Sequence, residues 1–420
     1  MPRDNPSGAL TGVRVLDLTQ VMAGAYCSML LADMGADVVK VERPDRGDET
    51  RRMGGPDIEA SPAFVAMNRN KRGLALDLKD PRGAELLRRL VSEADVVVEN
   101  FRPGTLERLG LGYEALKTAR PELIYCSISG FGSTGPYAGQ GGFDLVAQAM
   151  SGLISMTGEP EGDPVKVGVP ICDLNAGLFG AYGVLTAYVH RLRTGEGQLV
   201  DTSLLEAGIA YTVWETSALF ATGEVARPLG SAHRLSAPYE VFPTADGWIA
   251  IGAANQRNWV RLCAVLGAGE LADDDRFVDN DARMAHRSEL VDELGRRLRE
   301  RTTADWLTDL TAAGVPSGPL NDIAQVYADP HVQAREMLVR TRHPRLGEVH
   351  HIGAPVKLSA TPAGIRHPAP LLGQHSRDVL ADAGVSAAEI DELIAAGVVR
   401  ETVDETVPAT RHSETAEVHS

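Results

Sequence analysis

VRVLDLTQVMAGAYCSMLLADMGADVVKVE, residues 13–42, carries the pattern of one strand–helix–strand unit. An apolar run at 13–18 predicts a buried strand, residues 25–35 predict an apolar helix, and residues 36–42 predict a second strand. Two strands joined by a helix lie parallel in one sheet, because parallel strands need a long crossover connection. This stretch therefore predicts an α/β fold.

The same alternation continues beyond this first unit. Short apolar runs at 74–78, 95–100 and 123–129 predict three further strands. Asp80 and Pro81 are an N-cap and first-turn pair that opens the helix after the first of them. Strands that are apolar on both faces need helices on both faces of the sheet. We therefore expect a Rossmann-like, doubly wound parallel sheet.

The domain organisation is predicted from shifts in composition. Gly, Pro and Ser accumulate around 222–240, which is typical of a linker. A strand (DGWIAIGA) and helical patterns follow, then an irregular stretch at 328–350 and a helical segment at 370–400. We expect an inserted smaller α+β domain, with the divisions 1–222 (large domain), 223–330 (small domain), 331–401 (return to the large domain) and 402–420 (disordered tail).

Charge and cysteine content exclude several classes of protein. The formal net charge is −16, so the chain has no general attraction for nucleic acid or for anionic membranes. The four cysteines show no CxxC spacing, and no apolar run is long enough to span a membrane. The start of the chain lacks the apolar segment of a signal peptide. We expect a cytoplasmic protein without a metal site, a disulfide or a bound cofactor.

A glycine-rich loop, GFGSTGPYAGQGG, occupies residues 130–142. Its Gly130, Gly132 and Gly135 match the GxGxxG pattern of dinucleotide sites. However, Pro136 and further glycines follow where the phosphate-binding helix should begin. The sequence favours a loop over an active site, and a dinucleotide site is the alternative.

Basic residues gather near the predicted strand ends although the whole chain is acidic. Arg43 stands at the end of the second strand, where α/β sheets bind ligands. Solvated surface charge is the alternative for any single residue. The shared placement predicts a phosphate-bearing ligand, held by cations among Arg43, Arg69, Lys71, Arg72, Lys79, Arg102 and Arg108.

Asp173 is a candidate nucleophile at the start of a long apolar helix. One interpretation is structural: Asp173 is an ordinary N-cap of the helix. The other is functional: its carboxylate attacks an acyl group. The helix N-terminus stabilises the ionised carboxylate in either case. Neighbouring Cys172 is a possible thiol nucleophile, but a buried structural cysteine is favoured because no histidine lies nearby in sequence.

Together these motifs resemble those of the class III CoA-transferases, the CaiB/BaiF type. This group includes formyl-CoA:oxalate and carnitine CoA-transferases and is related to the α-methylacyl-CoA racemases. The resemblance runs from about Gly12 to Val399. It rests on VLDLTQVMAG, LADMGADVVKVERP, NKRGLALDLK, VENFRPG, the Asp173 segment, GQLVDTSLLEA and LLGQHSRDVL.

The resemblance implies an interlocked homodimer and an enzyme that acts on acyl-CoA and a carboxylic acid without a separate cofactor. It implies that Asp173 is the catalytic nucleophile, which forms a mixed anhydride and then an aspartyl-CoA thioester. It also implies that coenzyme A is contacted by Val21, Ala23, Arg43, Leu76, Lys79, Asn100, Phe101 and Arg108.

Three departures from the family pattern bear on the substrate. Met22 and Gly141 replace a glutamine and a lysine of the oxalate enzyme, which argues against oxalate. Phe143 stands where the racemases have a histidine. Racemization needs two acid/base groups, so CoA transfer is predicted and a 2-methylacyl-CoA racemase is the alternative. Arg51 and Arg52 are spare cations that suggest a dicarboxylate such as succinate.

Overall fold

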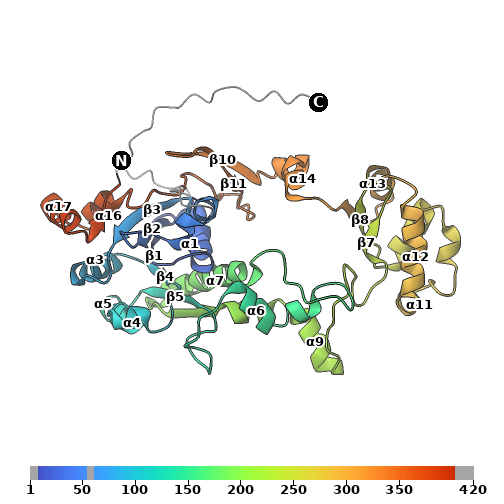
Figure 1. Ribbon diagram of the computed structural model, residues 1–420, viewed down its shortest axis with the longest axis horizontal. Coiled ribbons are helices and arrows are strands. Elements are labelled where there is room, and N and C mark those ends of the chain that lie inside the picture. Colours follow the sequence, from blue (N-terminus) through green and yellow to red (C-terminus); the bar gives the residue numbers. More distant parts are fainter. Residues whose placement is uncertain (1–7, 54–60, 403–420) are drawn as a thin grey trace. The chain divides into compact units, whose positions relative to one another are not determined.

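The computed structural model describes residues 8–53 and 61–402 (Figure 1). The described residues form two compact units. The first comprises Val167–Trp214 and the described parts of Met1–Gly152 and His331–Ser420, and the second comprises Leu153–Lys166 and Glu215–Pro330. The predicted domain boundaries stay predictions. Apart from residue 402, the predicted tail lies outside the described residues.

A seven-stranded sheet forms the centre of the first unit. Its order is β12-β3-β2-β1-β4-β5-β6, and every neighbouring pair is parallel except β12 with β3. The strands are β1 Arg14–Asp17, β2 Asp37–Glu42, β3 Lys71–Leu76, β4 Val96–Glu99, β5 Ile124–Ser129, β6 Leu199–Ser203 and β12 Val399–Arg400. The α/β architecture with a mostly parallel sheet is therefore confirmed.

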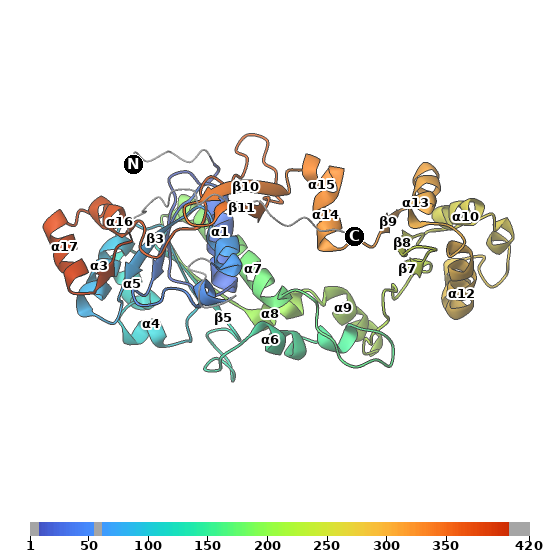
Figure 2. The ribbon, with the colours of Figure 1, turned by 45° about the horizontal axis from the view of Figure 1, so that its top comes forward.

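Helices cover both faces of this sheet, as the apolar strands require. On one face, α1 contacts β1, β2 and β4, and α7 contacts β5 and β6; Figure 2 shows α1 and α7 side by side. On the other face, α3, α5, α16 and α17 share one buried cluster with alternate strand residues such as Leu16, Val39 and Val97. These helices are α1 Ala23–Asp33, α7 Ile171–Thr194, α3 Pro81–Val91, α5 Tyr113–Ala119, α16 Ser376–Asp382 and α17 Ala387–Ala395.

The second unit has its own antiparallel sheet and its own core. The sheet has the order β7-β8-β9, and Phe242, Trp259 and Phe277 are almost fully buried beside it. Its elements are β7 Tyr239–Pro243, β8 Trp248–Gly252, α10 Gln256–Val265, α11 Asn280–Ala285, α12 Arg287–Leu298, α13 Thr303–Ala312 and β9 Ser317–Pro319.

Two sequence predictions need correction. The stretch predicted to be irregular contains an antiparallel hairpin, β10 Leu338–His343 and β11 Gly347–Ile352. Its strands were missed because they are rich in charged residues rather than apolar ones. The third predicted strand also begins earlier, at Lys71, because the charge of Lys71 is buried in an ion pair.

The remaining α-helices are short. They are α2 Pro62–Asn68, α4 Thr105–Arg108, α6 Asp144–Met150, α8 Leu204–Ala210, α9 Val213–Thr222, α14 Ile323–Ala328 and α15 Pro330–Ala334. Of the helices within residues 8–53 and 61–402, none has the length and apolar character needed to cross a membrane.

Candidate active site

The parallel strands bring most of the predicted CoA residues to one edge of the sheet. Because β1, β2, β3 and β4 are parallel, the segments that follow them leave the sheet on the same side. From β1 the chain adds β2 and β3 on one side of the sheet and then returns to add β4 and β5 on the other side of β1. The crevice between β1 and β4 is therefore the topological switch point. Residues at or after these strand ends include Val21 and Ala23 (β1), Arg43 (β2), Leu76 and Lys79 (β3), and Asn100 and Phe101 (β4).

The loop after β1 is fixed to the turn after β4 by a pair of hydrogen bonds. The side chain of Asn100 accepts from the backbone N–H of Gln20 at 2.8 Å and donates to its carbonyl oxygen at 2.7 Å. Val21 follows with a φ of +63°, a left-handed conformation that β-branched residues rarely adopt. This part of the predicted CoA site is therefore held in place by hydrogen bonds within the protein.

Arg43, Lys79 and Arg108 are all exposed on this side of the sheet and could reach phosphate groups. Arg43 forms an ion pair with Asp45 at 2.6 Å, and both side chains are about half exposed. Exposed pairs of this kind contribute little free energy, so a phosphate could replace Asp45 at small cost. Arg108 ends α4 and donates to the hydroxyl of Thr105.

Other predicted cations are committed to structural ion pairs. Lys71 and Arg69 are buried against Asp17 and Asp33, with separations of 2.8 and 2.7 Å. Arg72 lies between Asp37 and Asp382. Arg69 and Lys71 are therefore too buried to bind a phosphate-bearing ligand, and the role of Arg72 stays a prediction.

Arg51 needs the same correction. It is 5 % exposed, and its guanidinium pairs with both carboxylate oxygens of Glu42 at 2.7 Å. It is therefore not a spare cation for a dicarboxylate, whereas Arg52 is exposed. Leu76 is also buried, in the core under the sheet, so it can meet a ligand only through its main chain.

Asp173 lies in the first turn of α7, and it is not the N-cap. Pro170 occupies the cap position and makes no side-chain cap hydrogen bond. Asp144, the first residue of α6, supplies that function from another helix. Its carboxylate accepts the backbone N–H of Cys172 at 2.9 Å and, more weakly, that of Asp173 at 3.4 Å. The Asp173 carboxylate is therefore left available for chemistry.

Burial, and to a smaller extent the nearby negative charge of Asp144, together raise the pKa of Asp173 to about 7. Burial also raises the pKa of the Cys172 thiol to about 11, and this residue has no exposed surface. A thiol that is buried and protonated at neutral pH is a poor nucleophile. The site therefore favours the carboxylate.

Close packing of α1 against α7 brings Asp173 towards the loop after β1. A Cβ atom at Gly177 would overlap the carbonyl oxygen of Ala23, and one at Gly180 would lie 3.3 Å from the sulfur of Cys27. The two contacts advance in the same direction along both helices, so the helices run parallel. Asp173 lies one turn before Gly177, on the same face of α7, and therefore level with the loop that precedes Ala23.

The glycine-rich loop leaves β5 beside the same edge. Its two ends are pinned together, because a Cβ atom at Gly130 would lie only 2.6 Å from the Cα atom of Gly142. Hydrogen bonds from Gly132 to Ser129 and from Ser133 to Asp201 anchor its first part. This loop begins after a sheet strand and returns to the start of α6, which carries Asp144.

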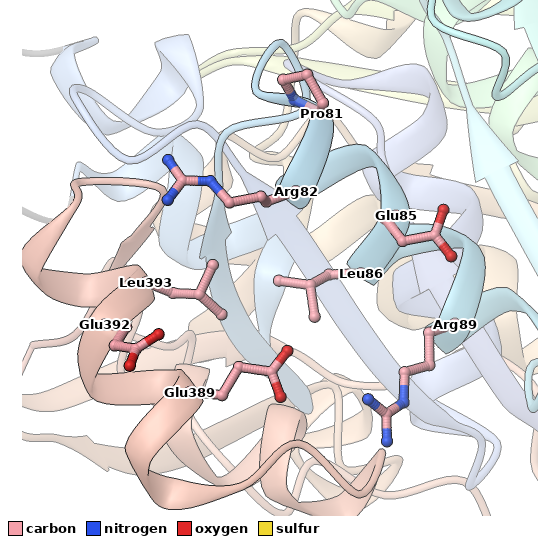
Figure 3. A pocket seen from close by; sticks show the side chains of 8 residues that line it. All are labelled: Pro81, Arg82, Glu85, Leu86, Arg89, Glu389, Glu392 and Leu393. Carbon is pink, nitrogen blue, oxygen red and sulfur yellow. The ribbon is translucent and has the colours of Figure 1, made fainter.

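A cavity of about 530 Å³ opens elsewhere on the first unit, between α3 and α17 (Figure 3). It contains none of the predicted site residues. Charged side chains of both signs surround it, together with two leucines: its lining is Pro81, Arg82, Glu85, Leu86, Arg89, Glu389, Glu392 and Leu393. This cavity lies on helices that cover the sheet, and the candidate chemistry lies at the carboxyl edge.

Sequence reasoning missed the role of Asp144. Its hydrogen bonds reach a helix 28 residues away in the sequence, and no local pattern marks such a contact. The pairing of Lys40 with Asp48, which lies beneath the loop after β1, was missed for the same reason.

The fold and the site define an α/β enzyme in which a carboxylate, that of Asp173, lies near the carboxyl edge of the sheet, where such folds bind ligands. Residues 10–376 match the model of CoA-transferase family III, so this chain belongs to that family and is a class III CoA-transferase. The sequence resemblance is therefore confirmed.

Individual relatives agree with the family assignment. The chain is 42% identical over 389 residues to a succinate–glutarate CoA-transferase of Agrobacterium fabrum, covering 91% of this chain and 97% of the relative. It is 40% identical to the succinyl-CoA:glutarate CoA-transferase of Mus musculus, covering 93% and 90%. A crystal structure of a CAIB/BAIF family protein from Brucella suis superposes with a TM-score of 0.81 at 39% identity, covering 90% of this chain and all of that chain.

Proposed function

We propose that this enzyme transfers coenzyme A between succinyl-CoA and a five-carbon dicarboxylic acid such as glutarate, with Asp173 as the covalent nucleophile. The observation that carries the proposal is the position of Asp173, in the first turn of α7 and level with the loop after β1. The choice of acids is supported by the two relatives described above, which are named for succinate or succinyl-CoA and glutarate.

The proposed reaction replaces one thioester with another of similar energy, through anhydride intermediates. The Asp173 carboxylate attacks the thioester carbonyl of the donor, which forms a mixed anhydride and releases CoA thiolate. The thiolate then attacks the aspartyl carbonyl, so that the donor acid leaves and an aspartyl-CoA thioester remains. The acceptor carboxylate attacks this thioester, and the thiolate attacks the acceptor acyl group of the new anhydride. The new acyl-CoA leaves, and Asp173 is regenerated.

The environment of Asp173 suits this role. A carboxylate whose pKa is about 7 is more basic, and therefore more nucleophilic, than an ordinary aspartate. Half of it is still ionised near neutral pH. The glycine-rich loop begins beside the same edge, and we expect it to cover the anhydride and keep water away.

The predicted CoA contacts stay part of this proposal. Val21, Ala23 and the Asn100–Phe101 turn would form the wall nearest the thioester, and Leu76 would contribute through its main chain. Arg43, Lys79 and Arg108 are exposed and would bind the phosphates. The charge-assisted contacts of arginine with phosphate are directional, so Arg43 and Arg108 are the stronger anchors.

We also propose that the working form is a homodimer, interlocked as in other members of the family. The outer face of α7 is apolar: Leu178, Tyr182, Leu185, Val189 and Leu192 follow each other every three or four residues, and Tyr182 is 68 % exposed. A continuous apolar stripe of this kind on a water-exposed helix is typical of a surface that another chain covers.

The experiment that tests the proposed function is mass spectrometry of the protein after incubation with a panel of acyl-CoA thioesters. Treatment with hydroxylamine or borohydride should leave a mass change on the peptide that carries Asp173, because both reagents attack activated carboxyl groups. Succinyl-CoA and glutaryl-CoA should label it, and the Asp173→Ala variant should stay unlabelled.

The racemase alternative predicts a different result. An unlabelled Asp173, together with exchange of the α-hydrogen of a 2-methylacyl-CoA for solvent deuterium, would contradict the proposed function. Phe143 argues against this outcome, because its side chain is 76 % exposed and has no group that can carry a proton.

A further inference from the structure

Four buried charges lie directly beneath the loop after β1. Asp17 of β1 pairs with Lys71 of β3 at 2.8 Å, and Lys40 of β2 pairs with Asp48 at 3.0 Å. The side chains of all four are fully buried. Two cations and two anions balance, which is the condition for keeping charges inside a protein.

This network forms hydrogen bonds with the backbone of the loop at two residues, Thr19 and Val21. Asp17 accepts the N–H of Thr19 at 2.9 Å, and Lys40 donates to the carbonyl oxygen of Thr19 at 2.8 Å. Asp48 accepts the N–H of Val21 at 3.2 Å through one carboxylate oxygen and at 3.3 Å through the other. Buried charged side chains therefore hold the backbone of the loop, and charged groups make stronger hydrogen bonds than neutral groups.

The conformation of Val21 explains what this binding achieves. A β-branched residue at φ +63° is strained, and such a backbone persists only where the surroundings fix it. The hydrogen bond from Val21 N–H to Asp48 acts on the strained residue itself. Without it, Val21 would relax to a negative φ, and the path of the chain into Ala23 would change.

We propose that Lys40 and Asp48 are positioning residues, which hold Val21 and the start of α1 in the shape that binds an acyl-CoA thioester. This inference rests on the proposed function, since Val21 and Ala23 are predicted CoA contacts. Neither Lys40 nor Asp48 touches the ligand in this proposal, because both are buried below the loop.

Asp48 is itself held in place by a further pair. Its backbone N–H donates to Glu42 at 2.9 Å, and Arg51 pairs with the same carboxylate. Its carboxylate also accepts the N–H and the hydroxyl of Thr50, at 2.9 and 2.7 Å. The carboxylate of Asp48 thus links the segment after β2 to the loop after β1. That segment starts with Arg43, the predicted phosphate contact.

The test compares two aspartates at opposite ends of α1 in the full-length protein. Asp48→Asn keeps the shape of the side chain but cannot accept from all its donors through two oxygens. Asp33→Asn is the matched control: Asp33 is also buried, and it pairs with Arg69 at 2.7 Å at the far end of the helix. Binding of free coenzyme A is measured by isothermal titration calorimetry, and stability is measured by thermal unfolding.

We expect both variants to unfold at a lower temperature and only Asp48→Asn to lose affinity. Its Kd for coenzyme A and its KM for acyl-CoA should rise about tenfold, while kcat changes much less.

Unchanged affinity in Asp48→Asn, or affinity losses of equal size in Asp48→Asn and Asp33→Asn, would each overturn the proposal. If Asp48→Asn does not fold, the charge-balanced variant Lys40→Met/Asp48→Asn replaces it, with the same expected outcomes. The proposed function fails separately: a wild-type protein that binds coenzyme A but transfers it to no dicarboxylic acid refutes the substrate assignment and leaves this test intact.

Discussion

At the scale of single residues, the pairing of Asp144 with α7 has two effects on Asp173. Asp144 accepts the backbone N–H groups at the start of that helix, so Asp173 is not needed as a cap. Its negative charge also raises the pKa of Asp173, in addition to the larger effect of burial. The capping residue therefore helps to set the pH range in which the proposed nucleophile would work.

This arrangement predicts the pH dependence of catalysis. Only ionised Asp173 can attack, and its raised pKa of about 7 means that kcat/KM should fall about tenfold per pH unit below that value. Asp144→Asn removes the like charge but keeps an oxygen for the N–H of Cys172. The pKa of Asp173 should then fall, and the acid limb of the kcat/KM profile should move to lower pH. An acid limb that stays in place in Asp144→Asn would show that Asp144 does not influence the nucleophile.

At the scale of elements, the packing of α1 against α7 sets the position of Asp173 relative to the loop after β1. Gly177 is required there, because a side chain would meet the carbonyl oxygen of Ala23. Gly177→Ala should push the helices apart, lower the free energy of unfolding by about 1–3 kcal/mol and reduce kcat/KM, since it separates Asp173 from the loop after β1. Urea unfolding and steady-state kinetics measure the two effects.

A glycine in another helix provides the control. A Cβ atom at Gly295 in α12 would meet only the flexible end of Arg299, at 3.5 Å. Gly295→Ala should therefore raise the free energy of unfolding by up to about 1 kcal/mol, because alanine favours the helix more than glycine does. If Gly177→Ala behaves like Gly295→Ala, the tight packing of α1 and α7 is not required.

The elements also show what the sequence could and could not predict. The strands at 13–18, 36–42, 95–100 and 123–129 were predictable because strands covered on both faces are continuously apolar. The hairpin of β10 and β11 was not, because its strands are polar and only pairing with each other defines them.

The candidate site was predictable to a similar extent. The parallel direction of the strands follows from the alternation of strands and helices, so the residues after each strand could be assigned to one edge. The partners of charged residues could not be assigned. Arg43 and Arg51 look alike in the sequence, yet one is exposed and the other is buried against Glu42. Burial and pairing depend on contacts between distant segments, which a single sequence does not reveal.

At the scale of the whole molecule, the apolar face of α7 connects assembly with catalysis. The inner face of this helix packs against α1 and carries Asp173, while the outer face exposes Tyr182 and its neighbours. A partner chain that covers the outer face would therefore also restrain the helix that holds the nucleophile. The proposed dimer is therefore relevant to activity as well as to solubility.

Tyr182→Glu tests this connection by placing a charge in the middle of the apolar stripe. Burying an unpaired carboxylate in an interface is unfavourable, so the variant should shift from dimer to monomer in size-exclusion chromatography with light scattering, and its kcat should fall with dilution. Thr118→Glu, on the exposed face of α5, adds the same charge and should stay dimeric. A dimeric and fully active Tyr182→Glu would mean that this face of α7 lies outside the interface, and that the position of Asp173 depends on α1 alone.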